Sequence, residues 1–221
     1  ANGLLPDFIQ AVAERHPGVL LEIDVVSTDE ATRLLLGGEV DLAVAFNLRA
    51  QRELHLLWSA ELPLGCAMAA GHPLARAPSL SLKDVAAWPL AVQSRALAIR
   101  RYLERRHAWL LQEARPPLVT NSLQLVKSLV RQGSHVALTS ELDVGPEILA
   151  GSVCFVPLQD HNAAPQTVGV AISGSRPLPR IARIVAEELA AFVQDHLARV
   201  REAGQGKKPV RSVRRRVQRG A

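Results

Sequence analysis

The stretch from Ser27 to Phe46 shows most clearly how apolar and polar positions alternate along this chain. Its spacing changes from that of a helix to that of a buried strand. Ser27 and Glu30 have the spacing of a capping box, in which two residues at a helix start cap each other. Apolar residues then recur at helical spacing as far as a pair of glycines at 37 and 38, which is typical of a helix end. The following segment, Leu42–Phe46, is continuously apolar and predicts a strand covered on both faces.

A second β-rich run, Val19–Val26, precedes this helix, so the pattern predicts a β-α-β unit. The helix of such a unit begins at the carboxyl end of the first strand, which is the edge where open α/β sheets bind ligands. Ser27 and Thr28 are therefore expected at a ligand-binding edge.

The remainder of the chain alternates in the same way, which predicts an α/β fold. Further helices are predicted over Leu4–Arg15, from Ser94 or Arg95 to His107, over Ser122–Gln132 and over Pro179–Glu202. Further strands are predicted over Leu54–Trp58, Pro63–Met68, Pro89–Gln93, Leu118–Asn121, Val136–Thr139, Val153–Pro157 and Thr167–Ile172. The helix at 122–132 has a wider apolar arc than one sheet contact requires; deeper burial and a second apolar contact both explain it.

Two of these segments resemble the effector-binding domain of LysR-type transcriptional regulators. Residues 16–46, HPGVLLEIDVVSTDEATRLLLGGEVDLAVAF, are similar to the start of that domain, with a Pro-Gly helix end, a strand, a Ser/Thr-opened helix and a Gly-acidic-x-Asp-Leu-Ala segment. Residues 121–140, NSLQLVKSLVRQGSHVALTS, are similar to its second-subdomain signature, with Gly133-Ser134-His135 in place of the usual Gly-x-Gly. The resemblance covers about residues 1–200.

The resemblance implies two Rossmann-like lobes joined by two crossover segments, as in type 2 periplasmic binding proteins. Lobe I would comprise 1–68 and 163–203 and lobe II 69–162, with crossovers near Met68 and Asp160. A small-molecule effector would bind between the lobes, and a homodimer or homotetramer would relay binding to a winged helix-turn-helix preceding Ala1. Such a regulator would act in the cytoplasm. The competing interpretation is a solute-binding protein of a transporter, and the residues encoded upstream of Ala1 would distinguish the two.

Small polar residues recur where the predicted helices and strands open toward the cleft. Helix N-termini present unpaired N–H groups that suit a carboxylate or another small anion, although each Ser or Thr can equally be only the cap of its own helix. By resemblance, the effector site comprises Ser27, Thr28, Ser94 and Thr139, with Gln93, Phe46 and Ser140 as further positions. We therefore expect a small polar or anionic ligand.

The net charge of +5 comes from the C-terminal end of the chain. Eight of the 26 basic residues and one of the 21 acidic residues follow position 200, which leaves 18 basic and 20 acidic residues, a net charge of −2, before it. The globular part therefore has no general attraction to nucleic acid. The basic segment 204–221 is predicted to be a disordered tail with at most non-specific contacts to DNA, which would otherwise be bound only by the N-terminal domain.

Several function classes lack their signatures in this sequence. There is no G-x-S-x-G, H-E-x-x-H, G-x-G-x-x-G or Walker motif, so we expect no enzyme. The seven histidines are scattered and are expected at the surface or in turns, and Cys66 and Cys154 lie in apolar runs as reduced core thiols. No stretch approaches the ~20 apolar residues of a membrane helix. We expect neither a metal nor a cofactor, and no membrane partner.

Overall fold

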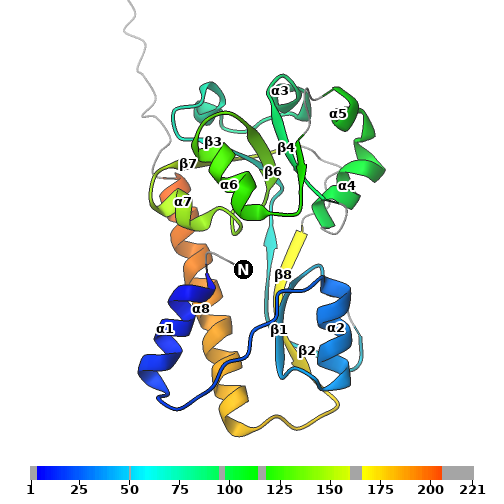
Figure 1. The fold of residues 1–221 in the computed structure, drawn as a ribbon, viewed down its shortest axis with the longest axis vertical. Coiled ribbons are helices and arrows are strands. Elements are labelled where there is room, and N and C mark those ends of the chain that lie inside the picture. Colours follow the sequence, from blue (N-terminus) through cyan, green and yellow to red (C-terminus); the bar gives the residue numbers. More distant parts are fainter. Residues whose placement is uncertain (1–3, 50, 95–97, 114–117, 160–165, 206–221) are drawn as a thin grey trace, which may run out of the picture.

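Two separate β-sheets divide the chain into two lobes, which lie one above the other along the long axis of the molecule (Figure 1). The computed structural model describes residues 4–49, 51–94, 98–113, 118–159 and 166–205. Lobe I is built on an antiparallel sheet with the order β1 (Leu42–Phe46), β8 (Gln166–Ser173), β2 (Leu54–Leu62). Lobe II is built on a mixed sheet with the order β5 (Leu118–Thr120), β4 (Leu90–Gln93), β6 (Val136–Thr139), β3 (Gly65–Ala69), β7 (Val153–Pro157). This two-sheet α/β architecture confirms the predicted fold class.

Most predicted helices are present. Lobe I carries α1 (Leu5–Arg15) and α2 (Thr28–Gly37), and lobe II carries a 3₁₀ turn (Pro73–Arg76), α3 (Leu82–Ala86), α4 (Ala98–Arg106), α5 (Ala108–Glu113), α6 (Leu123–Arg131) and α7 (Gly145–Leu149). The last helix, α8 (Arg180–Gln205), begins beside lobe I and ends beside lobe II (Figure 1). The predicted tail lies largely outside the described residues, and so does the predicted helix start at 95.

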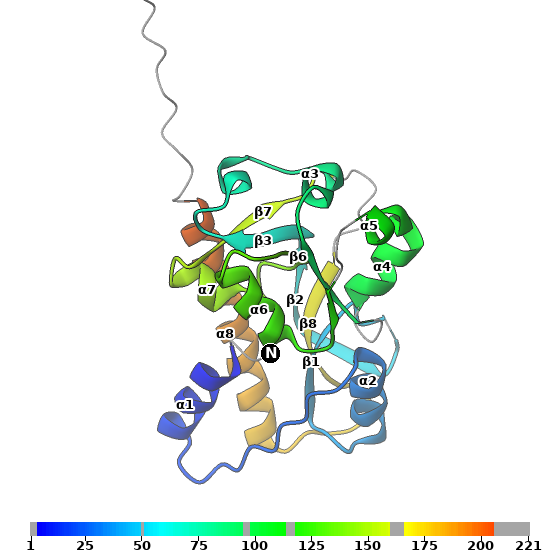
Figure 2. The same cartoon turned by 45° about the horizontal axis from the view of Figure 1, so that its top comes forward.

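Helix α8 belongs to the cores of both lobes. Its first half contributes Val185, Leu189 and Val193 to the lobe I core, which also contains Phe8 of α1. Near its end, Val200 packs in the core beneath α6 and α7 of lobe II. Figure 2 shows the end of α8 next to α7 from a second angle. Because its apolar residues lie in both cores, α8 is a continuous connection between the lobes.

Helix α2 begins and ends as its sequence predicts. The Ser27 hydroxyl oxygen accepts the backbone N–H of Glu30 at 3.3 Å, and Gly38 ends the helix with a φ of +72°. The Glu30 carboxylate pairs with Arg33 at 2.8 Å instead of returning to the helix start, so only half of the capping box forms.

The predicted strand at Val19–Val26 is wrong. Residues 19–27 belong to no helix or strand, and Leu20 is 92% exposed. Strand β1 buries Ala43 and Ala45 but exposes Val44, so it is covered on one face rather than both. No β-α-β unit forms. Strand β1 pairs antiparallel with β8, and within the described chain no backbone hydrogen bond joins β1 to residues 20–26. A β-rich composition forms a strand only where a partner strand pairs with it.

The expected lobe boundaries, 1–68 with 163–203 and 69–162, remain predictions. Sheet membership places β3 in lobe II, because Gly65 pairs with Thr139 of β6 and Met68 pairs with Cys154 of β7. We therefore propose that the first crossover lies just before residue 65.

The two cysteines are free thiols. Cys66 is fully buried in the lobe II core, and burial raises the pKa of its thiol to about 12. Cys154 is half-buried, and its Sγ lies 3.5 Å from the carbonyl oxygen of Ala75. Both therefore act as core thiols, as the sequence predicts. Within the described residues, every helix is too short or too polar to span a bilayer.

Candidate functional site

The edge of lobe II that faces lobe I is formed by the ends of two neighbouring strands. Strands β4 and β6 run parallel, so their carboxyl ends, at Gln93 and Thr139, meet at the same edge of the sheet. Thr139 lies opposite Gly65, the first residue of β3. Two of the predicted site residues therefore lie at the junction between the lobes.

The matching edge of lobe I is the end of β1 together with the start of α2. Phe46 pairs with Val168 at the junction end of β8, and the Thr28 hydroxyl donates a hydrogen bond to the Phe46 carbonyl at 3.1 Å. This bond fixes the start of α2 against the end of β1. Ser27 precedes it as the exposed cap of the helix.

Two contacts join these edges across the junction. Arg101 of α4 lies 3.8 Å from the Asp29 carboxylate in the first turn of α2, and both views show α4 over α2 (Figures 1 and 2). Leu142, just after β6, packs against the lobe I cluster of Leu62, Val168 and Leu197, which Phe46 also contacts. The structure therefore brings the predicted residues of both lobes to one interface.

The predicted hydroxyl groups of lobe II are already hydrogen-bonded to one carboxylate. The Thr139 hydroxyl donates to Oδ2 of Asp143 at 2.8 Å, and the Ser140 hydroxyl donates to the same oxygen at 2.9 Å. The Gln93 amide lies 3.5 Å from the Thr139 oxygen. Gln93, Thr139 and Ser140 are buried, so these groups form a hydrogen-bonded unit at the end of the sheet.

Ser94 and Ser122 are both hydrogen-bonded to neighbouring backbone. Ser94 is half-buried, and its N–H donates to the carbonyl of Thr120 at 2.9 Å. The exposed Ser122 accepts the N–H of Leu125 at 3.2 Å as the cap of α6. Ser27 and Ser122 thus both serve as caps, which was one of the two interpretations open for each such residue.

Asp143, Arg101 and Asp29 were not among the residues predicted from the sequence. Asp143 was not singled out, although the Ser-x-x-Asp spacing of Ser140 and Asp143 is a capping pattern that could have identified it. Arg101 and Asp29 carry no local signal, since their proximity depends on how the lobes are arranged.

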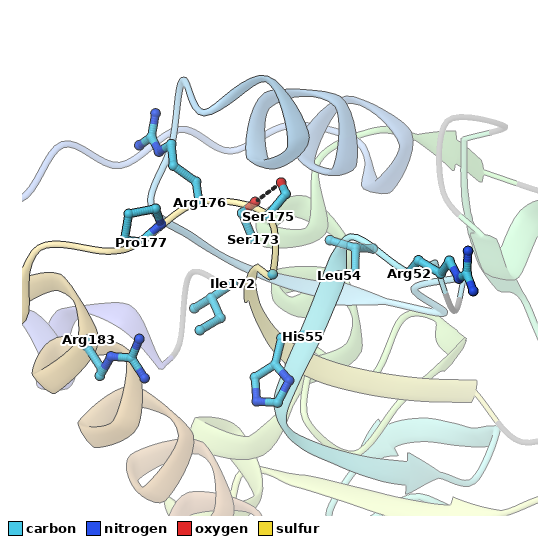
Figure 3. Close-up of a pocket in the computed structure, with 10 residues that line it drawn as sticks. Arg52, Leu54, His55, Ile172, Ser173, Ser175, Arg176, Pro177 and Arg183 are labelled. Atoms are coloured by element: carbon cyan, nitrogen blue, oxygen red, sulfur yellow. Dashed lines mark hydrogen bonds between the residues drawn. The ribbon is translucent and has the colours of Figure 1, made fainter.

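The larger cavity lies away from this junction. A cavity of about 530 Å³ adjoins the ends of β2 and β8 and the start of α8. Figure 3 shows that its arginines do not converge: Arg52 and Arg176 point in different directions, and Arg183 approaches from α8. Arg176 also donates to the carbonyl of Gly38 at 2.9 Å and lies 3.5 Å from Asp41. None of the predicted site residues lines this cavity.

A narrow gap, too small to hold a water molecule, lies between α4 and strands β4 and β6. Gln93 and Arg100 are its polar lining residues. Arg100 is paired with Glu104 at 2.9 Å. The gap places apolar side chains next to the hydrogen-bonded unit of lobe II.

The histidine prediction fails at one position. His196 of α8 is 2% exposed and has no hydrogen-bond partner on either ring nitrogen, whereas it was expected at the surface or in a turn. Among the described residues, no group of three or more His, Cys, Asp and Glu side chains is arranged to hold a metal ion.

Two α/β lobes with polar residues of both lobes at their junction define the class of two-lobe effector-binding domains. Residues 1–197 match the LysR substrate binding domain, and the chain therefore belongs to that family. It is an effector-sensing regulatory domain, and the alternative of a transporter's solute-binding protein is not favoured.

Two curated proteins that are similar to this chain are named as transcription regulators. The chain is 27% identical over 146 residues to the HTH-type transcriptional regulator CysB of Burkholderia cenocepacia, covering 65% of this chain and 46% of that protein. It is 25% identical over 139 residues to a probable nitrogen assimilation transcriptional activator of Synechococcus elongatus, covering 61% and 44%. The chain thus spans less than half the length of the curated relatives that it matches.

Solved structures of LysR-type proteins share the fold. A Corynebacterium glutamicum OxyR C206 mutant matches with a TM-score of 0.65 at 18% identity, over 92% of this chain and 64% of that chain. The C-terminal domain of a probable LysR family regulator from Rhodococcus sp. RHA1 matches with a TM-score of 0.61 at 21% identity, over 84% and 91%. The effector binding domain of a BenM variant matches with a TM-score of 0.60 at 18% identity, over 89% and 90%.

Proposed function

We propose that the effector binds at the junction between the lobes, in contact with the residues singled out from the sequence. These residues are Ser27, Thr28 and Phe46 of lobe I and Gln93, Ser94, Thr139 and Ser140 of lobe II. The observation that carries the proposal is the Arg101–Asp29 contact, which joins α4 to the start of α2 beside these groups. A ligand held there contacts both lobes and therefore favours one lobe arrangement over another.

How far an effector shifts the lobe arrangement depends on how much more tightly it binds one arrangement than the other. An effector can change the balance between two lobe arrangements only by as much as its affinities for them differ. In the whole protein, a winged helix-turn-helix preceding this domain would bind DNA, and a homodimer or homotetramer would transmit the shift to it. Such a regulator would work in the cytoplasm. The named relatives support this proposal because they are regulators that extend well beyond the matched region.

The location of the site can be tested with hydroxyl-to-methyl variants. We expect Thr28→Val and Thr139→Val to weaken effector binding, because each removes a hydroxyl at the junction; one lost hydrogen bond costs about 0.5–1.5 kcal/mol. The measurement is a thermal-shift screen of small carboxylates, amino acids and aromatic acids, in which hits should stabilise wild type more than either variant.

Thr32→Val is the matched control, because the Thr32 hydroxyl donates to the carbonyl of Thr28 at 2.9 Å within the same helix. The control should keep the wild-type response to each hit. If hits stabilise wild type, Thr28→Val and Thr139→Val equally, the effector binds elsewhere and these hydroxyls have only structural roles.

A further inference from the structure

Asp143 determines which hydrogen bonds the lobe II side of the junction can offer. An ionised carboxylate only accepts, so the Thr139 and Ser140 hydroxyls that contact its Oδ2 atom must be donating their protons to it. Each hydroxyl has a single proton, so neither can donate to a ligand while it is bonded to Asp143. The Ser140 oxygen also accepts the backbone N–H of Asp143 at 3.3 Å, and the Thr139 oxygen accepts the Gln93 amide at 3.5 Å. On lobe I, Thr28 likewise uses its proton on the Phe46 carbonyl.

Among the residues that the structure describes, no Lys, Arg or His side chain forms an ion pair with Asp143. Two nearby cations are already paired, Arg201 with Glu141 at 2.7 Å and Lys127 with Glu147 at 2.8 Å. Asp143 is half-buried, so its carboxylate is partly shielded from water. Water screens such a charge less than it screens a fully exposed one.

The turn that carries Asp143 faces lobe I. Leu142, its immediate neighbour, packs on the lobe I cluster that includes Val168 and is contacted by Phe46. A molecule held between the lobes therefore meets a half-buried carboxylate on this side. A carboxylate or phosphate oxygen placed beside Asp143 would meet a like charge, whereas an ammonium group would meet an acceptor of opposite charge.

We propose that the effector carries an amino group, in its charged ammonium form, and that this group binds Asp143 with Thr139 and Ser140. This inference rests on the proposed location of the effector site and narrows the expectation of a polar or anionic ligand. Asp143 would be the specificity-determining residue, with Thr139 and Ser140 holding its carboxylate in place.

The test compares ligand pairs that differ only in the amino group. The complete 221-residue chain is screened by thermal shift, and hits are measured by calorimetry, against amino acids, their carboxylic acid analogues without the amino group, and simple alkylamines at millimolar concentrations. We expect hits among the amine-bearing members only. Asp143→Asn keeps the shape of the side chain but removes its charge. It should weaken the affinity for these amine-bearing hits at least tenfold, which corresponds to about 1.4 kcal/mol.

Glu141→Gln is the matched control. This variant removes one negative charge two residues away, at a carboxylate that is already paired with Arg201. The affinity for the amine-bearing hits should stay within twofold of wild type. The absence of amine-bearing hits, or equal binding by Asp143→Asn and wild type, would overturn the inference. Hits without an amino group that remain sensitive to Thr28→Val would overturn the ammonium inference while keeping the junction site. Hits that ignore Thr28→Val, Thr139→Val and Asp143→Asn alike would overturn both.

Discussion

His196 is a polar side chain that folding buries without giving it a partner. Its two ring nitrogens have no hydrogen bond, and α7 makes room for the ring by having a glycine at position 145, where an added Cβ would lie 2.8 Å from Nε2. Burial is the main cause that lowers the pKa of His196, the charge of Arg199 lowers it further, and Asp7 opposes both. The imidazole is therefore kept neutral between α7 and α8.

Stability should fall in acid because of this residue. The unfolded chain binds a proton at His196 near the ordinary pKa of about 6.5, whereas the folded chain binds it only at lower pH. The contribution of the neutral His196 to folding stability is therefore complete above the ordinary pKa and is lost as the pH falls from there toward the lowered pKa of the folded chain. We expect urea unfolding to show a loss of stability as the pH falls below about 6.5, and His196→Leu should reduce that loss.

The exposed His55 provides the control for this measurement. His55→Gln should keep the wild-type loss of stability in acid, since it removes an imidazole that is already in water. An identical pH dependence in His196→Leu and wild type would show that the loss comes from other groups.

Helix α6 and helix α7 are joined by a buried ion pair. The Lys127 ammonium lies 2.8 Å from Oε1 of Glu147, with 4% of the Lys127 side chain and 12% of the Glu147 side chain exposed. The second carboxylate oxygen, Oε2, is buried without a hydrogen-bond partner. The pair therefore depends on one contact, and removing either charge leaves the other desolvated.

Removing the lysine alone should be costly. We expect Lys127→Met to destabilise the chain by about 3–5 kcal/mol, because it leaves the Glu147 carboxylate buried and uncompensated. Replacing both residues, in Lys127→Met with Glu147→Leu, should recover most of the loss. Urea denaturation of the single and double variants measures the coupling as a double-mutant cycle.

The exposed pair of Arg33 and Glu30 in α2 is the comparison, and Arg33→Met should be close to neutral because water already surrounds both charges. A loss for Lys127→Met that the double variant does not recover would mean that the lysine matters for packing rather than for charge.

The expected contact with a second copy of the chain concerns helix α6, on which one leucine is exposed. On α6, Val126 and Val130 are buried in the core, whereas Leu125 is 44% exposed, so the wide apolar arc of the sequence is divided between core and surface. Self-association through this face and lobe I of a neighbour is the expectation from the family resemblance.

The oligomer prediction is tested at Leu125. We expect sedimentation to show a dimer of wild type that Leu125→Glu weakens, because the substitution places a charge in an apolar contact. Leu149→Glu is the control, since Leu149 of α7 is 41% exposed on the same lobe. A wild type that stays monomeric at high concentration would remove this prediction.

Features specified by neighbouring residues were predictable from the sequence. The caps and ends of α2, the cap of α6 at Ser122 and the short apolar strands depend on contacts within a few residues, and the structure has them where the pattern indicates. Gln93 and Thr139 also lie at one sheet edge, because the parallel strands β4 and β6 end together there.

Features that require residues distant in the chain were decided only by the tertiary structure. The run at 19–26 has a strand's composition but no paired partner, and strand formation depends on pairing rather than on composition. The Arg101–Asp29 and Lys127–Glu147 contacts and the burial of His196 depend on how lobes and helices pack, which no local pattern records. The sequence by itself therefore determined the longer helices, the ends of α2 and the family, but not the short helices α3, α5 and α7. Packing determined which polar groups are paired, buried or left for a ligand.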